Sequence, residues 1–229
     1  MRVICVIALC FATISGFAAE IYPNRPIRIL VGQSAGGATD IVARGLGQKL
    51  NEALGQPVVI DNRGGAAGSI AAALVAKASP DGYTVLIVPG SFTINPSLYK
   101  DLPFDPQKDL AAVTLIATAP YVLMLHPAVP AKSVRELIAL VKAKPKEFVY
   151  GSGGFGSSGH LAAELFSSMA ALQMNHVPYK GAGPALVDLL GGQLQLVFGS
   201  VVSSLPYHRN GRLRALALTS SKRNPIPIR

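Results

Sequence analysis

The chain has 229 residues, half of them apolar, which is enough to bury one large core or two modest ones. Only 14% of the residues are charged and no long polar tract occurs, so an intrinsically disordered chain is excluded. The net charge is +9, but the basic residues are scattered, which argues against a nucleic-acid partner and favours mild attraction for anionic ligands.

Residues 1–19 have the pattern of a secretory signal peptide. Arg2 is followed by an almost wholly apolar run, 3–17, and then by the small residues Ala18 and Ala19. The apolar run is too short to favour a membrane span, and an uncleaved anchor is the alternative. We therefore expect export to the periplasm, with cleavage near Ala18 or Ala19.

Both cysteines, Cys5 and Cys10, lie in this leader. The mature chain therefore lacks thiols, which excludes disulfides, thiolate metal ligands and thiol catalysis. The four histidines are dispersed and form no H-x-x-x-H or H-E-x-x-H pair. The sequence accordingly predicts neither a metal site nor a cofactor.

After the leader, short apolar strands alternate with amphipathic helices. The first half predicts strands and helices in the order 26–31, 40–54, 57–60, 70–78 and 83–88. A turn-rich region, 95–109, is followed by two predicted strands, 111–118 and 121–126. The second half predicts the helices 133–144, 160–172, 184–190 and 203–210 among the strands 148–150, 174–177, 193–198 and 213–218.

This alternation predicts an α/β fold. Strand, helix, strand in repetition favours parallel sheets with right-handed crossovers, and continuous apolar strands suit sheets covered on both faces. The second half repeats the first in kind, so we expect two lobes that close over a cleft. Lobe 1 is expected over 20–118 with a return segment at 219–229, and lobe 2 over 119–218.

Two glycine-rich loops that precede helices, 33–40 and 151–160, are suited to holding an anion. Their glycines let the backbone approach a ligand, and the helix that follows offers unpaired N–H groups and a partial positive charge. A carboxylate or a phosphate is the natural guest. The alternative, a tight turn in which Asp40 caps its helix, remains open.

Two enzymatic interpretations of the second loop are weaker. The loop matches G-x-G-x-x-G, but His176 stands where a dinucleotide fold needs an acidic residue about twenty positions later. Ser152, Ser157 and His160 lie close together in sequence, as a hydrolase would require. Serines before helices are commonly caps, however, and no G-x-S-x-G elbow occurs. We therefore expect binding without catalysis.

Several segments together resemble the substrate-binding proteins of tripartite tricarboxylate transporters, also called the Bordetella uptake gene (Bug) family. Two of them are Gly36-Gly37-Ala38-Thr39-Asp40 and His176-Val177-Pro178-Tyr179-Lys180-Gly181. The resemblance covers nearly all of the mature chain, in order, through 22–28, 36–44, 61–68, 79–84, 94–99, 150–164, 176–181, 188–193 and 213–217.

The resemblance implies a type II, Venus-flytrap periplasmic binding protein that is not an enzyme. It implies a small carboxylate ligand, which is a dicarboxylate, a tricarboxylate or an acidic amino acid, held by amides, hydroxyls and ordered waters. The implied partners are the membrane permease subunits of the transporter, and we expect a monomer. A sensor component of a signalling system is the alternative. The predicted ligand-binding residues are Gln33, Ser34, Gly36, Gly37, Asp40, Ser91, Thr93, Ser152, Gly156, Ser157, Ser158, His160, Tyr179 and Ser200.

Three features depart from the family pattern. Gly32-Gln33-Ser34-Ala35 stands where family members usually carry an aromatic residue and prolines, and Gly199-Ser200 stands where an acidic residue is common. Both differences bear on which carboxylate is bound. The chain also ends at Arg229, whereas family members continue further. We therefore expect an incomplete, marginally stable first lobe, and a nonfunctional remnant is a further alternative.

Overall fold

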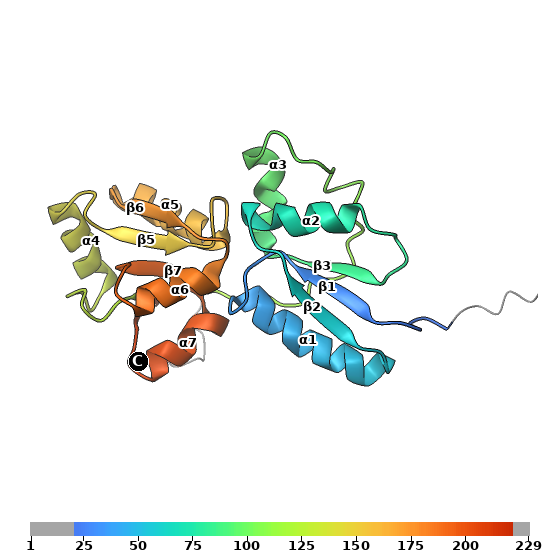
Figure 1. The fold of residues 1–229 in the computed structure, drawn as a ribbon. Coiled ribbons are helices and arrows are strands. Elements are labelled where there is room, and N and C mark those ends of the chain that lie inside the picture. The colour runs from blue at the N-terminus through green and yellow to red at the C-terminus, as the bar shows by residue number, and fades with distance from the viewer. Residues whose placement is uncertain (1–20, 222–229) are drawn as a thin grey trace, which may run out of the picture.

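The computed structural model describes residues 21–221, which form two α/β lobes side by side (Figure 1). The predicted signal peptide, 1–19, and most of the predicted return segment, 219–229, lie outside the described residues. Within 21–221, the strands of one sheet all come from 27–87 and those of the other from 121–218. No helix in this part of the chain is long and apolar enough to cross a membrane.

The sheet of the first lobe is parallel, with the order β2-β1-β3. Its strands are β1 (Ile27–Val31), β2 (Val58–Asn62) and β3 (Thr84–Ile87). Helix α1 (Ala38–Leu54) packs on one face, and α2 (Ser69–Ala76) packs on the other (Figure 1). In the central strand Ile27 and the residues 29–31 are buried, whereas Arg28 is exposed and interrupts the apolar run.

Helix α1 is amphipathic, as predicted. Ala43, Leu46 and Leu50 pack against the sheet, because residues three and four apart share one helical face. Gly55 ends the helix in the left-handed conformation with φ of 66°, and its N–H donates to the carbonyl of Asn51. The helix therefore runs in one register along the sheet and begins at the sheet's carboxyl edge, beside the loop 33–37.

The sheet of the second lobe has the order β6-β5-β7-β4-β8. Its strands are β4 (Tyr121–Leu125), β5 (Val149–Ser152), β6 (Asn175–Pro178), β7 (Leu196–Ser200) and β8 (Arg214–Leu218). Strand β5 is parallel to β6 and β7, but β4 is antiparallel to β7 and β8. The prediction of parallel sheets is thus right for the first lobe and for β6-β5-β7, and wrong for β4. An apolar run such as β4 reports burial on both faces, and it carries no information on strand direction.

Four helices cover the second sheet within the described residues. They are α4 (Val134–Ala143), α5 (Ser158–Ala170), α6 (Ala182–Leu190) and α7 (Val201–Arg209). Helices α4 and α5 pack on one face, around Tyr150 and Leu196, and α6 and α7 pack on the other, around Met124 and Val197. Helices α5, α6 and α7 each begin directly after a strand or a short loop, so their N-termini gather at one edge of the sheet.

The segment between the lobes differs from the prediction. The expected strand 111–118 is extended but belongs to no sheet among the described residues, and all of its side chains are exposed. Its composition favours extended backbone, yet a strand exists only where a neighbour pairs its N–H and C=O groups. The predicted turn-rich region before it, 95–109, also holds a short helix, α3 (Asn95–Leu98). Two 3₁₀ turns precede α3 in the loops, η1 (Ala66–Gly68) and η2 (Gly90–Ile94).

Packing in the second lobe predicts the effect of truncating Leu137 on α4. This side chain is fully buried in the cluster around Tyr150, so Leu137→Ala should lower the free energy of unfolding by about 2–5 kcal/mol. Leu165→Ala on α5, where the side chain is 61% exposed, is the matched control and should change stability by less than about 0.5 kcal/mol. Urea unfolding followed by circular dichroism measures both, and equal losses would contradict the packing described here.

Candidate functional site

The loops at the carboxyl ends of the strands meet between the lobes around a small cavity. Its volume is about 20 Å³, which is room for about one water molecule. Gln33 comes from the first lobe, after β1, and the other lining residues come from the second lobe. Open α/β sheets bind ligands at this edge. The polar side chains on the wall are Gln33, Tyr121, Ser152, Ser157, Ser203 and Ser204.

The two lobes touch through backbone at this edge. Gly183 at the start of α6 lies so close to the carbonyl oxygen of Ala35 that no side chain would fit there. Gly156 is packed against the side chain of Leu98 in α3. Helices α1 and α7, which come from different lobes, also contact each other (Figure 1). The two lobes are therefore in direct contact at this edge.

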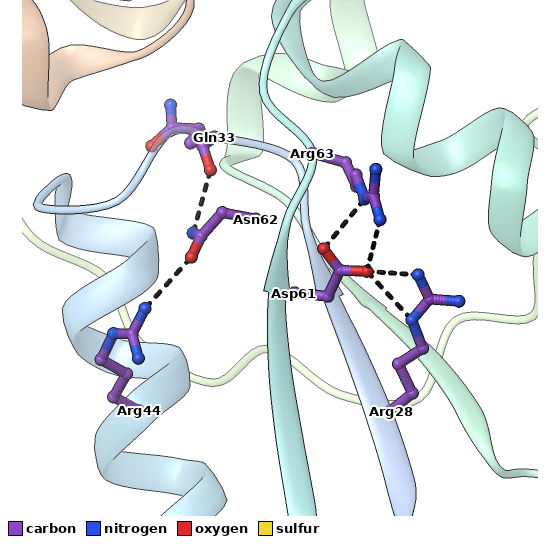
Figure 2. Close-up of polar contacts among 6 residues, drawn as sticks. All are labelled: Arg28, Gln33, Arg44, Asp61, Asn62 and Arg63. Carbon is purple, nitrogen blue, oxygen red and sulfur yellow. Dashed lines mark hydrogen bonds and ion pairs between the residues drawn. The ribbon is translucent and has the colours of Figure 1, made fainter.

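A chain of hydrogen bonds braces the first loop, 33–37 (Figure 2). Asn62 at the end of β2 donates to the carbonyl oxygen of Gln33 at 3.1 Å and accepts from Arg44 of α1 at 3.1 Å. Arg44 also pairs with both carboxylate oxygens of Asp40, at 3.0 and 3.1 Å. Asp40 in turn accepts from the N–H of Gly36 at 3.0 Å. We call Arg44, Asp40 and Asn62 the loop brace, because together they fix the loop to both α1 and β2.

Asp40 therefore serves the loop rather than the cavity. It stands in the first turn of α1 and reaches back to the N–H of Gly36, which is the cap-like role left open by the sequence. Burial alone would raise the pKa of Asp40, but hydrogen bonds from Arg44 and Gly36 outweigh burial and hold the pKa below its ordinary value. The carboxylate is thus ionised and does not line the cavity; its Oδ1 is buried and, apart from the ion pair with Arg44, has no hydrogen-bond partner among the described residues.

A second ion-pair network lies beside the loop brace but does not touch the loop (Figure 2). Asp61, one residue before Asn62 on β2, pairs with Arg28 of β1 and with Arg63. Hydrogen bonds from Arg28 and Arg63 lower the pKa of Asp61. Neighbouring residues on one strand point to opposite faces, so the two networks are separate.

The second loop is organised by serine hydroxyls. Ser157 caps α5, since its Oγ accepts from the N–H of His160 at 3.3 Å. Ser152 Oγ accepts from the N–H of Gly154 at 3.1 Å and lies 2.7 Å from His176 Nε2. Ser152 Oγ also donates to the carbonyl oxygen of Gly154 at 3.1 Å, so of these two cavity-lining serines it is Ser157 that retains its hydroxyl proton for another acceptor.

The Ser152–His176 pair has the spacing of a nucleophile and its base, but it lacks other features of a catalytic site. His176 Nδ1 is buried and has no hydrogen-bond partner among the described residues, so no third group orients the ring. Burial, followed by the nearby His160, lowers the pKa of His176 from 6.5 to about 4. A base of that strength is poorly matched to neutral pH. The residues 21–221 also hold no cluster of His, Cys, Asp or Glu suited to a metal ion.

The structure brings some of the predicted site residues to the cavity and not others. Gln33, Ser152 and Ser157 line it. Ser34 is packed against Gly181 of the other lobe, with its Oγ buried and without a hydrogen-bond partner in 21–221. Gly36 adopts a left-handed φ of 79°.

The remaining predicted residues have local roles, and a ligand contact for them stays a prediction. Gly37 is the N-cap residue of α1, and Ser200 caps α7 through the N–H of Val202. Tyr179 donates to Asp188 at 2.5 Å.

Thr93 is exposed and donates to the carbonyl of its own turn, while Ser91 is buried away from the cavity wall. Gly156 donates to His160, the ring of His160 lies tilted against that of His176 with centroids 4.4 Å apart, and Ser158 is the first residue of α5.

Three polar side chains of the cavity wall were missed by the sequence analysis, namely Tyr121, Ser203 and Ser204. Ser204 has no exposed surface, and its Oγ lacks a hydrogen-bond partner among the described residues. A signal for the two serines did exist, because they stand in the first turns of a helix that directly follows a buried strand. Tyr121 gave no such signal, since it starts the strand whose direction was mispredicted.

Comparison with known proteins agrees with this geometry. The family model for the tripartite tricarboxylate transporter family receptor matches residues 42–226. Protein BugT of Bordetella pertussis (strain Tohama I) is 40% identical over 97% of this chain and 70% of its own length. The chain belongs to the tripartite tricarboxylate transporter receptor family.

Solved structures of related receptors share the fold. An R. palustris protein with adipate is 40% identical, with a TM-score of 0.85 over 88% of this chain and 68% of that one. MatC from Rhodopseudomonas palustris with bound malate is 31% identical, with a TM-score of 0.82 over 89% of this chain and 70% of that one. The predicted family and the two-lobed fold of periplasmic solute-binding proteins are thus confirmed.

The loop brace predicts a local effect of Asn62→Ala. This change removes the hydrogen bonds to Gln33 and Arg44, so the amides of loop 33–37 should exchange with solvent at least tenfold faster, which corresponds to about 1.4 kcal/mol of lost protection. Hydrogen exchange with peptide-level mass spectrometry measures this. Asp61→Asn disturbs the neighbouring network on the same strand and is the control, and an equal effect of both variants would contradict a specific brace.

The buried histidine predicts a pH dependence of stability. The folded-state pKa of His176 is about 4 and the ordinary pKa is 6.5, so between these values the unfolded chain binds more protons. Stability should therefore fall as the pH drops from about 6.5 toward 4. His176→Gln should flatten this slope in urea titrations, with a residual slope from His160, whose pKa burial also lowers. A slope unchanged by the substitution would disprove the assignment.

Proposed function

We propose that this receptor captures a small carboxylate between its lobes, as a dicarboxylate, a tricarboxylate or an acidic amino acid, and delivers it to permease subunits of a tripartite transporter. The observation that carries the proposal is the convergence of helix N-termini and hydroxyl donors on one cavity. Two relatives with the same fold hold adipate and malate, which supports the ligand class. We propose further that the chain acts in the periplasm as a monomer, without a cofactor and without turnover.

None of the described residues that line the cavity is cationic, so an anion bound there would be held by backbone N–H groups and neutral side-chain donors. The N-termini of α5, α6 and α7 reach the cavity through Ser157, Ala182 and Ser203, and α1 begins just after the loop that carries Gln33. Each helix start offers free N–H groups and a charge equivalent to roughly half a positive unit. Hydroxyl and amide donors to a carboxylate form charge-assisted hydrogen bonds, which are about twice as strong as neutral ones.

Ligand entry requires the lobes to separate. The cavity has room for about one water molecule, so a dicarboxylate would need the lobes to move apart before it could bind there. The connection 111–120 is suited to a hinge, because it is extended and almost wholly exposed and lies outside both sheets. Closure around the ligand would then bring Gln33 and the helix starts of the second lobe to the same anion.

The test is stabilisation of the folded receptor by carboxylates. At a ligand concentration a hundred times its Kd, the free energy of unfolding should rise by about 2.7 kcal/mol. A panel of di- and tricarboxylates and acidic amino acids, screened by thermal melting and then by calorimetry, measures this. A cooperatively folded sample that responds to no carboxylate would overturn the proposal.

A pair of capping serines supplies a matched variant and control. Ser157 caps α5 at the cavity, and Ser133 caps α4 away from it by accepting from the N–H of Glu136 at 3.2 Å. Either serine to alanine change should cost about 1 kcal/mol of stability. Only Ser157→Ala also removes a donor to the anion, so it should weaken binding about tenfold or more. Equal affinities of the two variants would exclude Ser157 from the site.

A further inference from the structure

A buried histidine stands directly behind the cavity wall of the second lobe. His176 of β6 places its Nε2 2.7 Å from the hydroxyl of Ser152, which lines the cavity. That hydroxyl has a single proton, which it donates to the carbonyl oxygen of Gly154, and it also accepts from the N–H of Gly154. A hydroxyl whose proton is in use can only accept from a ring nitrogen, so Nε2 of His176 carries a proton.

The other ring nitrogen of His176 is open to a second proton. Nδ1 is buried and has no hydrogen-bond partner among residues 21–221. A proton added there would make the ring a cation without breaking a hydrogen bond of the described chain. The neighbouring His160 differs, because its Nδ1 already accepts from the N–H of Gly156 at 3.3 Å. A proton that enters this pair of rings therefore goes to His176.

The groups that face His176 come from β5, from α5 and from the loop between them. Strand β5 contributes Tyr150, whose ring stacks on the imidazole with centroids 4.7 Å apart, and α5 contributes His160 and Glu164. Phe155 of the loop meets the ring edge-on at 5.0 Å and carries no charge. Burial, and then a charge on His160, oppose a cationic ring, whereas the carboxylate of Glu164 favours it. The pair of rings can thus hold one proton but not two.

We infer that His176 supplies the charge that balances an anion in the cleft, so that capture of the anion at mildly acidic pH is accompanied by uptake of a proton at Nδ1 of this ring. This inference rests on the proposed function and deepens it, because the described residues of the cavity wall are all neutral. His176 is a positioning residue. It acts through Ser152 and through space, and it does not touch the ligand.

The distance from the cavity wall to the ring decides the size of this coupling. An anion in contact with the Ser152 hydroxyl lies about 3 Å from Oγ, and therefore within about 6 Å of the imidazole. At that separation and an effective dielectric constant of about 20, their attraction shifts the protonation equilibrium roughly a hundredfold. Burial, followed by His160, lowers the pKa of His176 to about 4 in the free receptor, so in the loaded receptor the ring should titrate near about pH 6.

Calorimetry in buffers of different ionisation enthalpy counts the protons taken up on binding. The probes are malate and adipate, which two relatives hold, and then the rest of the carboxylate panel. At about pH 5 the wild type should take up roughly 0.8 proton more than His176→Gln, and its affinity relative to that variant should rise about tenfold between about pH 7 and about pH 5. Ionisation of the probe itself is common to both proteins and cancels in the comparison.

Two further variants separate an effect of charge from an effect of structure. Glu164→Gln keeps an acceptor for the hydroxyl of Tyr150 but removes the negative charge beside the ring, so the pH of half-maximal uptake should fall. His126→Gln, at the end of β4 away from the cavity, is the control and should leave the uptake unchanged. Proton NMR of the wild type needs no variant: the titration midpoint of His176 should rise on loading from about 4 to about 6.

The outcomes separate this inference from the proposed function. Equal uptake in the wild type and His176→Gln, or a midpoint that does not move on loading, would overturn the inference and leave carboxylate capture intact. Uptake that is lost in His160→Gln but kept in His176→Gln would overturn the assignment to His176. A folded protein that binds no carboxylate would overturn the proposed function, and the inference with it.

Discussion

The organising constraint of this structure is that every helix start leaves backbone N–H groups without intrahelical partners. In both lobes, these starts follow strands at the same edge, so the unpaired donors of α1, α5, α6 and α7 gather between the sheets. Serine hydroxyls satisfy part of this demand, as Ser157 and Ser200 do. The backbone N–H groups that remain unpaired create a region of positive potential, although the residues that carry them are neutral. This region gives the cleft its preference for anions.

Such a site depends on rigid loops, because a backbone N–H group forms a strong hydrogen bond only when it points at the acceptor. The first loop gains this rigidity from the loop brace, which ties Gln33 and Gly36 to α1 and β2. The second gains it from Ser152, which bridges its own turn and the edge strand β6 through His176. Ionised groups thus act one layer behind the cavity, where they orient donors without contributing a charge to the wall.

The sequence was informative wherever local chemistry decides the outcome. The alternation of apolar strands with amphipathic helices located α1, and the glycine-rich loops located the edge where the lobes meet. The sequence was uninformative where the structure of a segment depends on residues that lie far away along the chain. The direction of β4 depends on how the chain enters the second lobe, and segment 111–118 has no pairing strand within residues 21–221 despite a suitable composition. Ser204 was missed for the same reason. Its burial and the absence of a hydrogen-bond partner within the described chain depend on the tertiary structure, not on the local sequence.

Glycines at the lobe contact determine how far the cleft closes. Gly181 against Ser34, Gly183 against Ala35 and Gly64 against Lys180 bring backbone to backbone, with no room for a side chain at any of them. A methyl group there would hold the lobes apart, and the donors of one lobe would no longer reach an anion bound to the other. The same loops therefore determine both how closely the lobes approach each other and how the cleft binds an anion. The glycines that permit the close approach of the lobes lie next to the amides and hydroxyls that would donate hydrogen bonds to an anion between them.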